Sequence, residues 1–153
     1  MNLQTVSQGR FPIEAMSDEA IATVERMEEL MLAQPQVELE TQHDIHGGMY
    51  ARSIMIPKGI MITGALVKIA TMLICVGDAV MYIGNDLVRV QGYAVIPASA
   101  GRKQWFLAKS DVYLTMIFPT QAKTVADAEK EFTDQWADLL SNHNENHVTI
   151  TGE

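Results

Sequence analysis

The stretch that decides the fold is Val80–Val90, VMYIGNDLVRV, in which two short apolar runs flank a turn sequence. Val80–Ile83 and Leu87–Val90 are rich in the β-branched and aromatic residues that favour strands. Gly84-Asn85-Asp86 lies between them, and such residues adopt the backbone conformations of tight hairpin turns. The sequence therefore predicts a β-hairpin near the middle of the chain.

The same pattern continues on both sides of this hairpin. Short runs of Ile, Val, Met and aromatic residues alternate with Gly, Pro, Asn and Asp, and no internal repeat is visible. Many short strands at regular spacing are typical of a β-sandwich or barrel, so we expect an all-β core over residues 46–120. The predicted strands are Met49–Ile56, Ile60–Thr63, Ala65–Ile69, Leu73–Val76, Val80–Ile83, Leu87–Val90, Tyr93–Ile96, Lys103–Ala108 and Val112–Phe118.

Helical periodicity lies on both sides of the predicted core. Ser17 precedes two acids and an apolar stripe, so residues 1–45 predict an arm followed by an amphipathic helix. Pro35 disfavours helical geometry at the residue before it, and the helix should end near Ala33. A second apolar stripe follows the cap-like Thr124 and predicts a C-terminal helix over residues 121–142. We expect residues 143–153 to be a frayed polar tail.

Composition and charge exclude several classes of protein. The chain has 153 residues, 48% of them apolar, which suits one domain with a real core. A net charge of −8 makes nucleic acid a poor partner. No apolar run reaches the length of a membrane span, and the single cysteine, Cys75, fits a reducing cytoplasm. Residues 46–120 nevertheless hold seven bases and three acids, and such a basic block can attract an anionic ligand.

The block from His43 to Thr120 resembles the small cupin-like proteins encoded by tailed bacteriophages and prophages. The resemblance implies a single cupin jelly-roll β-barrel with an N-terminal and a C-terminal α-helix. It also implies that the protein works in the cytoplasm of the host. The motifs that carry the resemblance are Met49-Tyr50-Ala51-Arg52, Ile56-Pro57-Lys58-Gly59, Ile62-Thr63-Gly64-Ala65, Gly77-Asp78, Pro97 to Gly101, Arg102-Lys103, and Ala108 with Asp111.

The metal-binding histidines of cupins are replaced in this chain. The resemblance places the first on Val67, the second on Thr71 and the late-strand one on Phe118. Valine and phenylalanine supply no lone pair, and a single threonine is not a metal site. We therefore expect no metal and no cofactor. The histidines present, which we interpret as loop and tail residues, are His43, His46, His143 and His147.

Strand alternation predicts which side chains face the inside of the barrel. If Val67 points inward, then Lys68 points outward, and every second residue shares the inner face. Two alternatives stay open: apolar side chains fill the barrel, or it holds an apolar or mixed ligand. The predicted interior residues are Ala65, Val67, Ile69, Thr71, Met116 and Phe118.

One segment, residues 102–106, combines bases with aromatic residues. Its Arg102 and Lys103, with Arg52 and Lys68, are the predicted partners of an anionic ligand, and Trp105 could stack on that ligand. The alternatives are that Trp105 packs against a helix and that Arg52 is a structural ion-pair partner.

The sequence favours a metal-free, non-catalytic phage-type cupin protein that binds a host protein through its surface. One alternative is a small-molecule binder, or sponge, for an anionic, nucleotide-like ligand. Another is an enzyme whose chemistry uses no metal. The apolar stripe of the C-terminal helix and an exposed sheet face also predict a homodimer.

Overall fold

The computed structural model describes residues 3–7, 13–83, 86–139, 141 and 146–151. These residues form two α-helices and a sheet of nine strands. In chain order the elements are β1 (Leu3–Ser7), α1 (Asp18–Leu32), β2 (Thr41–His46), β3 (Met49–Ile56), β4 (Met61–Thr63), β5 (Thr71–Ile83), β6 (Asp86–Ala98), β7 (Trp105–Ala108), β8 (Val112–Pro119), α2 (Val125–Phe132), a 3₁₀-helix (Trp136–Asp138) and β9 (Asn146–Ile150).

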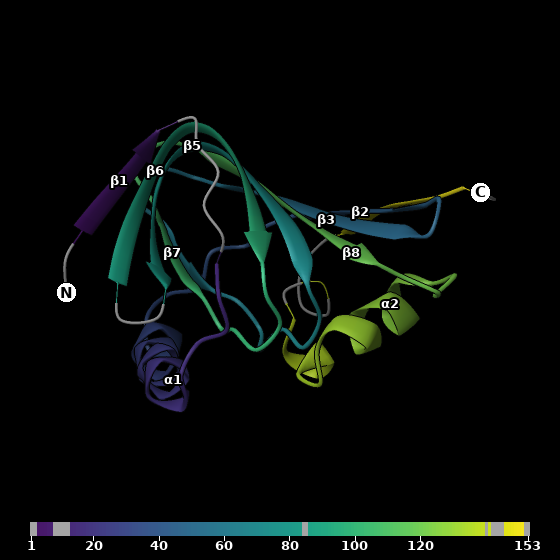
Figure 1. The fold of residues 1–153 in the computed structure, drawn as a ribbon, viewed down its shortest axis with the longest axis horizontal. Coiled ribbons are helices and arrows are strands. Elements are labelled where there is room, and N and C mark those ends of the chain that lie inside the picture. The colour runs from purple at the N-terminus through teal and green to yellow at the C-terminus, as the bar shows by residue number, and fades with distance from the viewer. Residues whose placement is uncertain (1–2, 8–12, 84–85, 140, 142–145, 152–153) are drawn as a thin grey trace.

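The strands form one curled sheet that arches over a concave side, with both helices below it (Figure 1). The order is β1-β6-β5-β8-β3-β2-β9, and β7 pairs with both β5 and β4. The predicted hairpin is present, because β5 and β6 are antiparallel from Ile83 and Asp86 onward. Its turn residues 84 and 85 lie outside the described residues. The predicted all-β core is therefore confirmed as a strand-rich half-barrel.

The long strand β5 changes partner at Gly77. Its first half, to Val76, pairs with β8, and its second half, from Ala79, pairs with β7. Gly77 lies opposite Gly92 of β6, and the two φ angles are 127° and 80°. A Cβ at residue 77 would lie 2.7 Å from the carbonyl oxygen of Asp111. Glycine therefore permits both the unusual backbone and the close approach of the crossing chain.

The helix α1 packs against the part of the sheet where β5, β6 and β7 meet. It begins after Ser17, whose Oγ accepts a hydrogen bond from the backbone nitrogen of Ala20 at 3.1 Å, and it ends at Leu32. The predicted cap and end are confirmed. No helix of the described chain is long and apolar enough to cross a membrane. The buried residues that join α1 to the sheet are Met16, Ala20, Val24, Tyr82 and Trp105.

The helix α2 packs instead against the concave face, near β3 and β8. Thr124 caps it, because its Oγ1 accepts a hydrogen bond from the backbone nitrogen of Asp127 at 3.3 Å. The rings of Phe118 and Phe132 stack with centroids 4.4 Å apart. The buried members of this cluster are Ile45, Tyr50, Val67, Phe118, Ala128, Phe132 and Leu139.

The C-terminal helix is shorter than the predicted span of residues 121–142. It ends at Phe132, and Thr133 has extended backbone angles. The carbonyl of Phe132 accepts a hydrogen bond from the backbone nitrogen of Lys68 at 2.8 Å, and Thr133 Oγ1 donates one to Leu66 at 2.7 Å. These bonds to a distant segment replace the next helical turn. The end of the helix at Phe132 is not visible in the sequence, because the apolar spacing continues past it and Leu139 still packs in the same cluster.

Two predicted irregular segments contain strands. Residues 1–16 include β1, which pairs with β6, and residues 143–153 include β9, which pairs with β2, both in parallel. The expectation of a frayed tail is therefore wrong for residues 146–150. Conversely, the predicted strand Ala65–Ile69 is wrong, because only Val67 makes bridges there, to Arg102 and Thr133. Each of these pairings joins distant parts of the chain, and local pattern carries little information about them.

Candidate ligand-binding site

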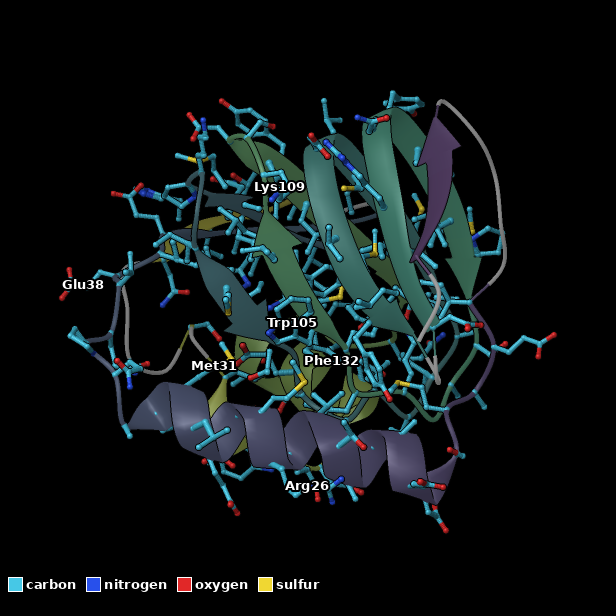
Figure 2. The ribbon with its side chains drawn as sticks, turned by 90° about the vertical axis from the view of Figure 1, so that its left-hand side faces the viewer. Arg26, Met31, Glu38, Trp105, Lys109 and Phe132 are labelled. Atoms are coloured by element: carbon cyan, nitrogen blue, oxygen red, sulfur yellow. The ribbon has the colours of Figure 1, made fainter. Side chains whose placement is uncertain are left out.

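A cavity of about 1000 Å³ lies on the concave side of the sheet. Strands β3 and β8 form one wall, and the other walls come from residues 59–67, residues 102–104 and the end of α2. The last turn of α1 and the loop after it form the rim, where Figure 2 shows Met31 and Glu38. Side chains on this side of the sheet therefore leave open space beside the packed core. Its apolar lining includes Ile54, Ile60, Ile62, Leu114, Met116 and Phe132.

Arg102 is the most unusual polar residue in this lining. The residue is only 1% exposed, and one guanidinium nitrogen, Nη1, donates to the carbonyl oxygen of Ser99 at 2.6 Å. The other two nitrogens, Nε and Nη2, are buried without a hydrogen-bond partner. Burial lowers the pKa of Arg102 to about 10, which leaves the group charged at neutral pH. The cavity wall thus contains an uncompensated positive charge, which is costly for the free protein.

Lys103, the next residue, already has partners. Its Nζ lies 3.2 Å from Glu28 Oε2 of α1 and 3.3 Å from Gln135 Oε1. Glu28 also accepts a hydrogen bond from Thr63 Oγ1 at 2.5 Å. The positive charge of Lys103 is therefore balanced within the protein. Nearby, the side-chain nitrogen Nε2 of Gln104 is buried without a partner, as in Arg102.

Arg52 is also paired. Its Nη1 lies 2.8 Å from Glu129 Oε2 of α2, and both side chains are buried. The same nitrogen lies 3.3 Å from the hydroxyl of Tyr50 and 3.2 Å from Ser141 Oγ, which also hydrogen-bonds to Glu129. Of the two interpretations from sequence, the ion pair is the one that the structure shows.

A buried histidine extends this network to the last strand. Nδ1 of His43 lies 2.6 Å from the Tyr50 hydroxyl, and Nε2 lies 2.7 Å from Asn146 Oδ1 of β9. Since a carbonyl oxygen only accepts, Nε2 carries the hydrogen and Nδ1 accepts from Tyr50. Burial lowers the pKa of His43 and raises the pKa of Tyr50 to about 12. The pair is therefore neutral and ties β2 and β3 to β9.

The other two predicted ligand-binding residues lie outside the cavity lining. Lys68 forms an exposed ion pair with Asp134 at 2.7 Å between Nζ and Oδ1. Trp105 is buried beside α1, above the helix in Figure 2, and its Nε1 has no hydrogen-bond partner. Packing against a helix, the alternative drawn from sequence, is what the structure shows for Trp105. Of the predicted set, Arg52, Arg102 and Lys103 are brought together and Lys68 and Trp105 are not.

The predicted interior residues divide into three groups. Ala65, Val67 and Met116 line the cavity. Phe118 is buried under α2, and Ile69 packs at the edge of the same cluster. Thr71 is buried at the start of β5, where its Oγ1 donates to the carbonyl oxygen of Ile69 at 3.2 Å.

Cys75 and the other described histidines are either buried or bonded to neighbouring side chains. Cys75 is buried in the core, and burial raises the pKa of its thiol to about 11. His46 Nδ1 lies 2.5 Å from Thr151 Oγ1, and His147 Nε2 lies 3.1 Å from Glu40 Oε2. His143 lies outside the described residues. Among the described residues, no group of three or more His, Cys, Asp or Glu side chains could hold a metal ion.

Sequence reasoning missed two carboxylates that matter to the site. Glu28 lies four residues after buried Val24, so it shares the apolar side of α1. Glu129 likewise lies three residues before buried Phe132 on α2. A carboxylate at helical spacing from core residues was the available signal that each one has a buried cationic partner.

No protein-family model matches the sequence, and no curated protein matches it. Among solved structures, the chain is similar to a cupin 2 conserved barrel domain protein from Leptotrichia buccalis, with 15% identity over 59% of this chain and 44% of that one, and a TM-score of 0.45. A cupin-2 domain containing protein from Shewanella frigidimarina matches with 10% identity, over 61% and 91% of the two chains, and a TM-score of 0.41. A salicylate 1,2-dioxygenase from Pseudaminobacter salicylatoxidans matches with 12% identity, over 75% and 35%, and a TM-score of 0.46. These likenesses concern the fold alone and assign the chain to no family.

Proposed function

We propose that this protein is a cupin-type half-barrel that binds a small, largely apolar molecule in its concave cavity. The observation that carries the proposal is the cavity of about 1000 Å³ between β3, β8, α2 and the end of α1. A volume of this size is typical of sites for small ligands, and so is a mainly apolar lining with a few polar groups.

The position of the cavity also supports binding. It lies beside the main core, whose side chains are closely packed around Leu73, Met81 and Ile96. Open apolar space of this kind leaves side chains such as Ile62 and Leu114 without contacts on one side, which costs dispersion energy in the free protein. An apolar ligand restores those contacts and removes apolar surface from water.

The binding of a host protein, the phage origin and the cytoplasmic location stay predictions from sequence. The cavity favours the small ligand over the host protein as the partner, because it is a built concave site. A non-metal enzyme stays the third possibility.

Binding can be tested with N-phenyl-1-naphthylamine, an uncharged apolar dye whose fluorescence rises in apolar sites. We expect saturable binding to the wild-type protein. Met116→Trp fills the cavity and should weaken binding about tenfold or more, because the dye loses apolar burial. Leu30→Trp adds the same side chain at an exposed position of α1 and should leave binding unchanged.

Two results would overturn this proposal. One is the absence of saturable binding of both the dye and 1-octanol. The other is unchanged binding by a folded Met116→Trp variant, since the ligand would then lie elsewhere. If that variant does not fold, Ala65→Phe fills the same cavity from residues 59–67 and takes its place in the test.

A further inference from the structure

We propose that the natural ligand carries a carboxylate, and that the free edge of the Arg102 guanidinium binds it. This inference rests on the proposed function, because it concerns the polar end of the same cavity. It adds the class of ligand, which is an amphipathic monocarboxylate with an apolar body. It also adds Arg102 as a residue that binds this ligand.

The geometry of Arg102 carries the inference. Nη1 is held by the carbonyl oxygen of Ser99 at 2.6 Å, whereas Nε and Nη2 are buried without partners. These two nitrogens lie on one edge of the planar group and present parallel N–H donors. Such an edge matches the two oxygens of a carboxylate in a bidentate pair. The protein has therefore fixed one end of the guanidinium and left the carboxylate-binding edge unused.

Charge balance distinguishes Arg102 from the other cations of the cavity. Arg52 is paired with Glu129, and Lys103 is paired with Glu28. In the described part of the chain, Arg102 has no acidic partner and is only 1% exposed. One uncompensated positive charge calls for one negative charge, which a carboxylate supplies at neutral pH.

The backbone around Arg102 is held in place on both sides. The backbone nitrogen of Val67 donates to the Arg102 carbonyl oxygen at 2.9 Å, and that of Gly64 donates to the Gln104 carbonyl oxygen at 2.9 Å. Arg102 and Gln104 both line the cavity, and Gln104 Nε2 is a further donor without a partner. The donors are therefore preorganised, so that little conformational entropy is lost when an anion binds.

The experiment compares octanoate with 1-octanol, which share an apolar chain and differ in charge, by isothermal titration calorimetry. We expect the wild-type protein to prefer octanoate. Arg102→Met should weaken octanoate binding about 10- to 150-fold, the effect of losing a charged hydrogen-bonded contact, and should change octanol binding less than about twofold. Lys68→Met, at an exposed ion pair outside the cavity, is the matched control and should change neither.

A stability measurement separates a binding role from a structural role. If Arg102 serves the ligand, the free Arg102→Met protein should melt at the same or a higher temperature, because a buried unpaired charge has been removed. A marked fall in melting temperature, with octanoate binding unchanged in the folded fraction, would overturn the inference. Arg102→Lys keeps the charge without the planar edge and should bind octanoate more weakly than the wild type.

The failure of this inference and of the proposed function are distinguishable. Equal binding of octanoate and octanol, both weakened by Met116→Trp, would leave the cavity function standing and overturn the carboxylate assignment. Octyl phosphate that binds more tightly than octanoate would also overturn that assignment. No binding of either octyl compound or of the naphthylamine dye would overturn the proposed function itself.

Discussion

Arg52 of β3 and Glu129 of α2 form a buried ion pair, with 2.8 Å between Nη1 and Oε2. The two side chains are 7% and 6% exposed, so water screens their interaction very little. Ser141 also hydrogen-bonds to the Glu129 carboxylate. The pair therefore joins the helix and the segment after it to the sheet, beside the cavity.

Removing one member of this pair should destabilise the protein strongly. We expect Arg52→Met and Glu129→Met each to lower the free energy of unfolding by about 3–5 kcal/mol, since each leaves an uncompensated buried charge. The double variant should lose less than either single variant. Urea denaturation followed by circular dichroism gives these values. Lys68→Met, at the exposed pair with Asp134, should cost less than about 1 kcal/mol, and an equal loss would contradict the prediction.

Gly77→Ala should destabilise the sheet where β5 changes partner. The new Cβ would lie 2.7 Å from a backbone oxygen, that of Asp111, and the φ angle of 127° is unfavourable for alanine. Strain of this kind costs about 1–3 kcal/mol, measurable as a lower urea midpoint. Gly64→Ala is the control, because its Cβ would meet its nearest atom at 3.9 Å. Equal midpoints for the two variants would show that Gly77 is replaceable.

The stability of the protein should fall as the pH falls below about 6.5, the ordinary pKa of histidine. Burial lowers the pKa of His43 in the folded state, so the unfolded chain binds the proton first. The stabilisation is thus present above pH 6.5 and is lost between that pH and the lowered pKa, at up to about 1.4 kcal/mol per pH unit. His43→Gln should reduce this slope, measured from about pH 7.5 to about pH 5.5, which is roughly one unit above and one unit below the ordinary pKa of histidine. His46→Gln, at an exposed position, should keep it.

The homodimer stays a prediction from sequence, and the convex face of the sheet is where we expect the contact. Met55, Tyr113, Val76 and Tyr93 are direct neighbours across four strands, and all four are exposed. Burying such a row against a second copy would remove apolar surface from water. Light scattering at micromolar concentration should show a dimer, and Tyr93→Ser with Tyr113→Ser should give a monomer. Leu30→Ser, exposed on α1, should remain dimeric, and a monomeric wild type would contradict the prediction.

The elements that the sequence predicted well are those determined by interactions between residues close together in the chain. Ser17 and Pro35 correctly predicted the two ends of α1, because capping and proline geometry act within one helical turn. The β5–β6 hairpin was likewise encoded by two apolar runs and the turn between them. The residues around the cavity, including Arg52, Arg102 and Lys103, were identified as a basic set, since their charge is visible in the chain itself.

What the sequence could not show is which of these charges is compensated. Glu129 reaches Arg52 across 77 residues, and Lys103 meets Glu28 only because α1 ends beside the cavity. The pairing of β9 with β2, and the end of α2 against residues 66–68, also depend on segments far apart in the chain. Local pattern determined the hairpin, the first helix and most of the strands within residues 46–120, because strand, turn and capping signals lie within a few residues. Tertiary structure alone decided that Arg102 is buried and unpaired, because compensation of a charge depends on every chain segment that packs around it.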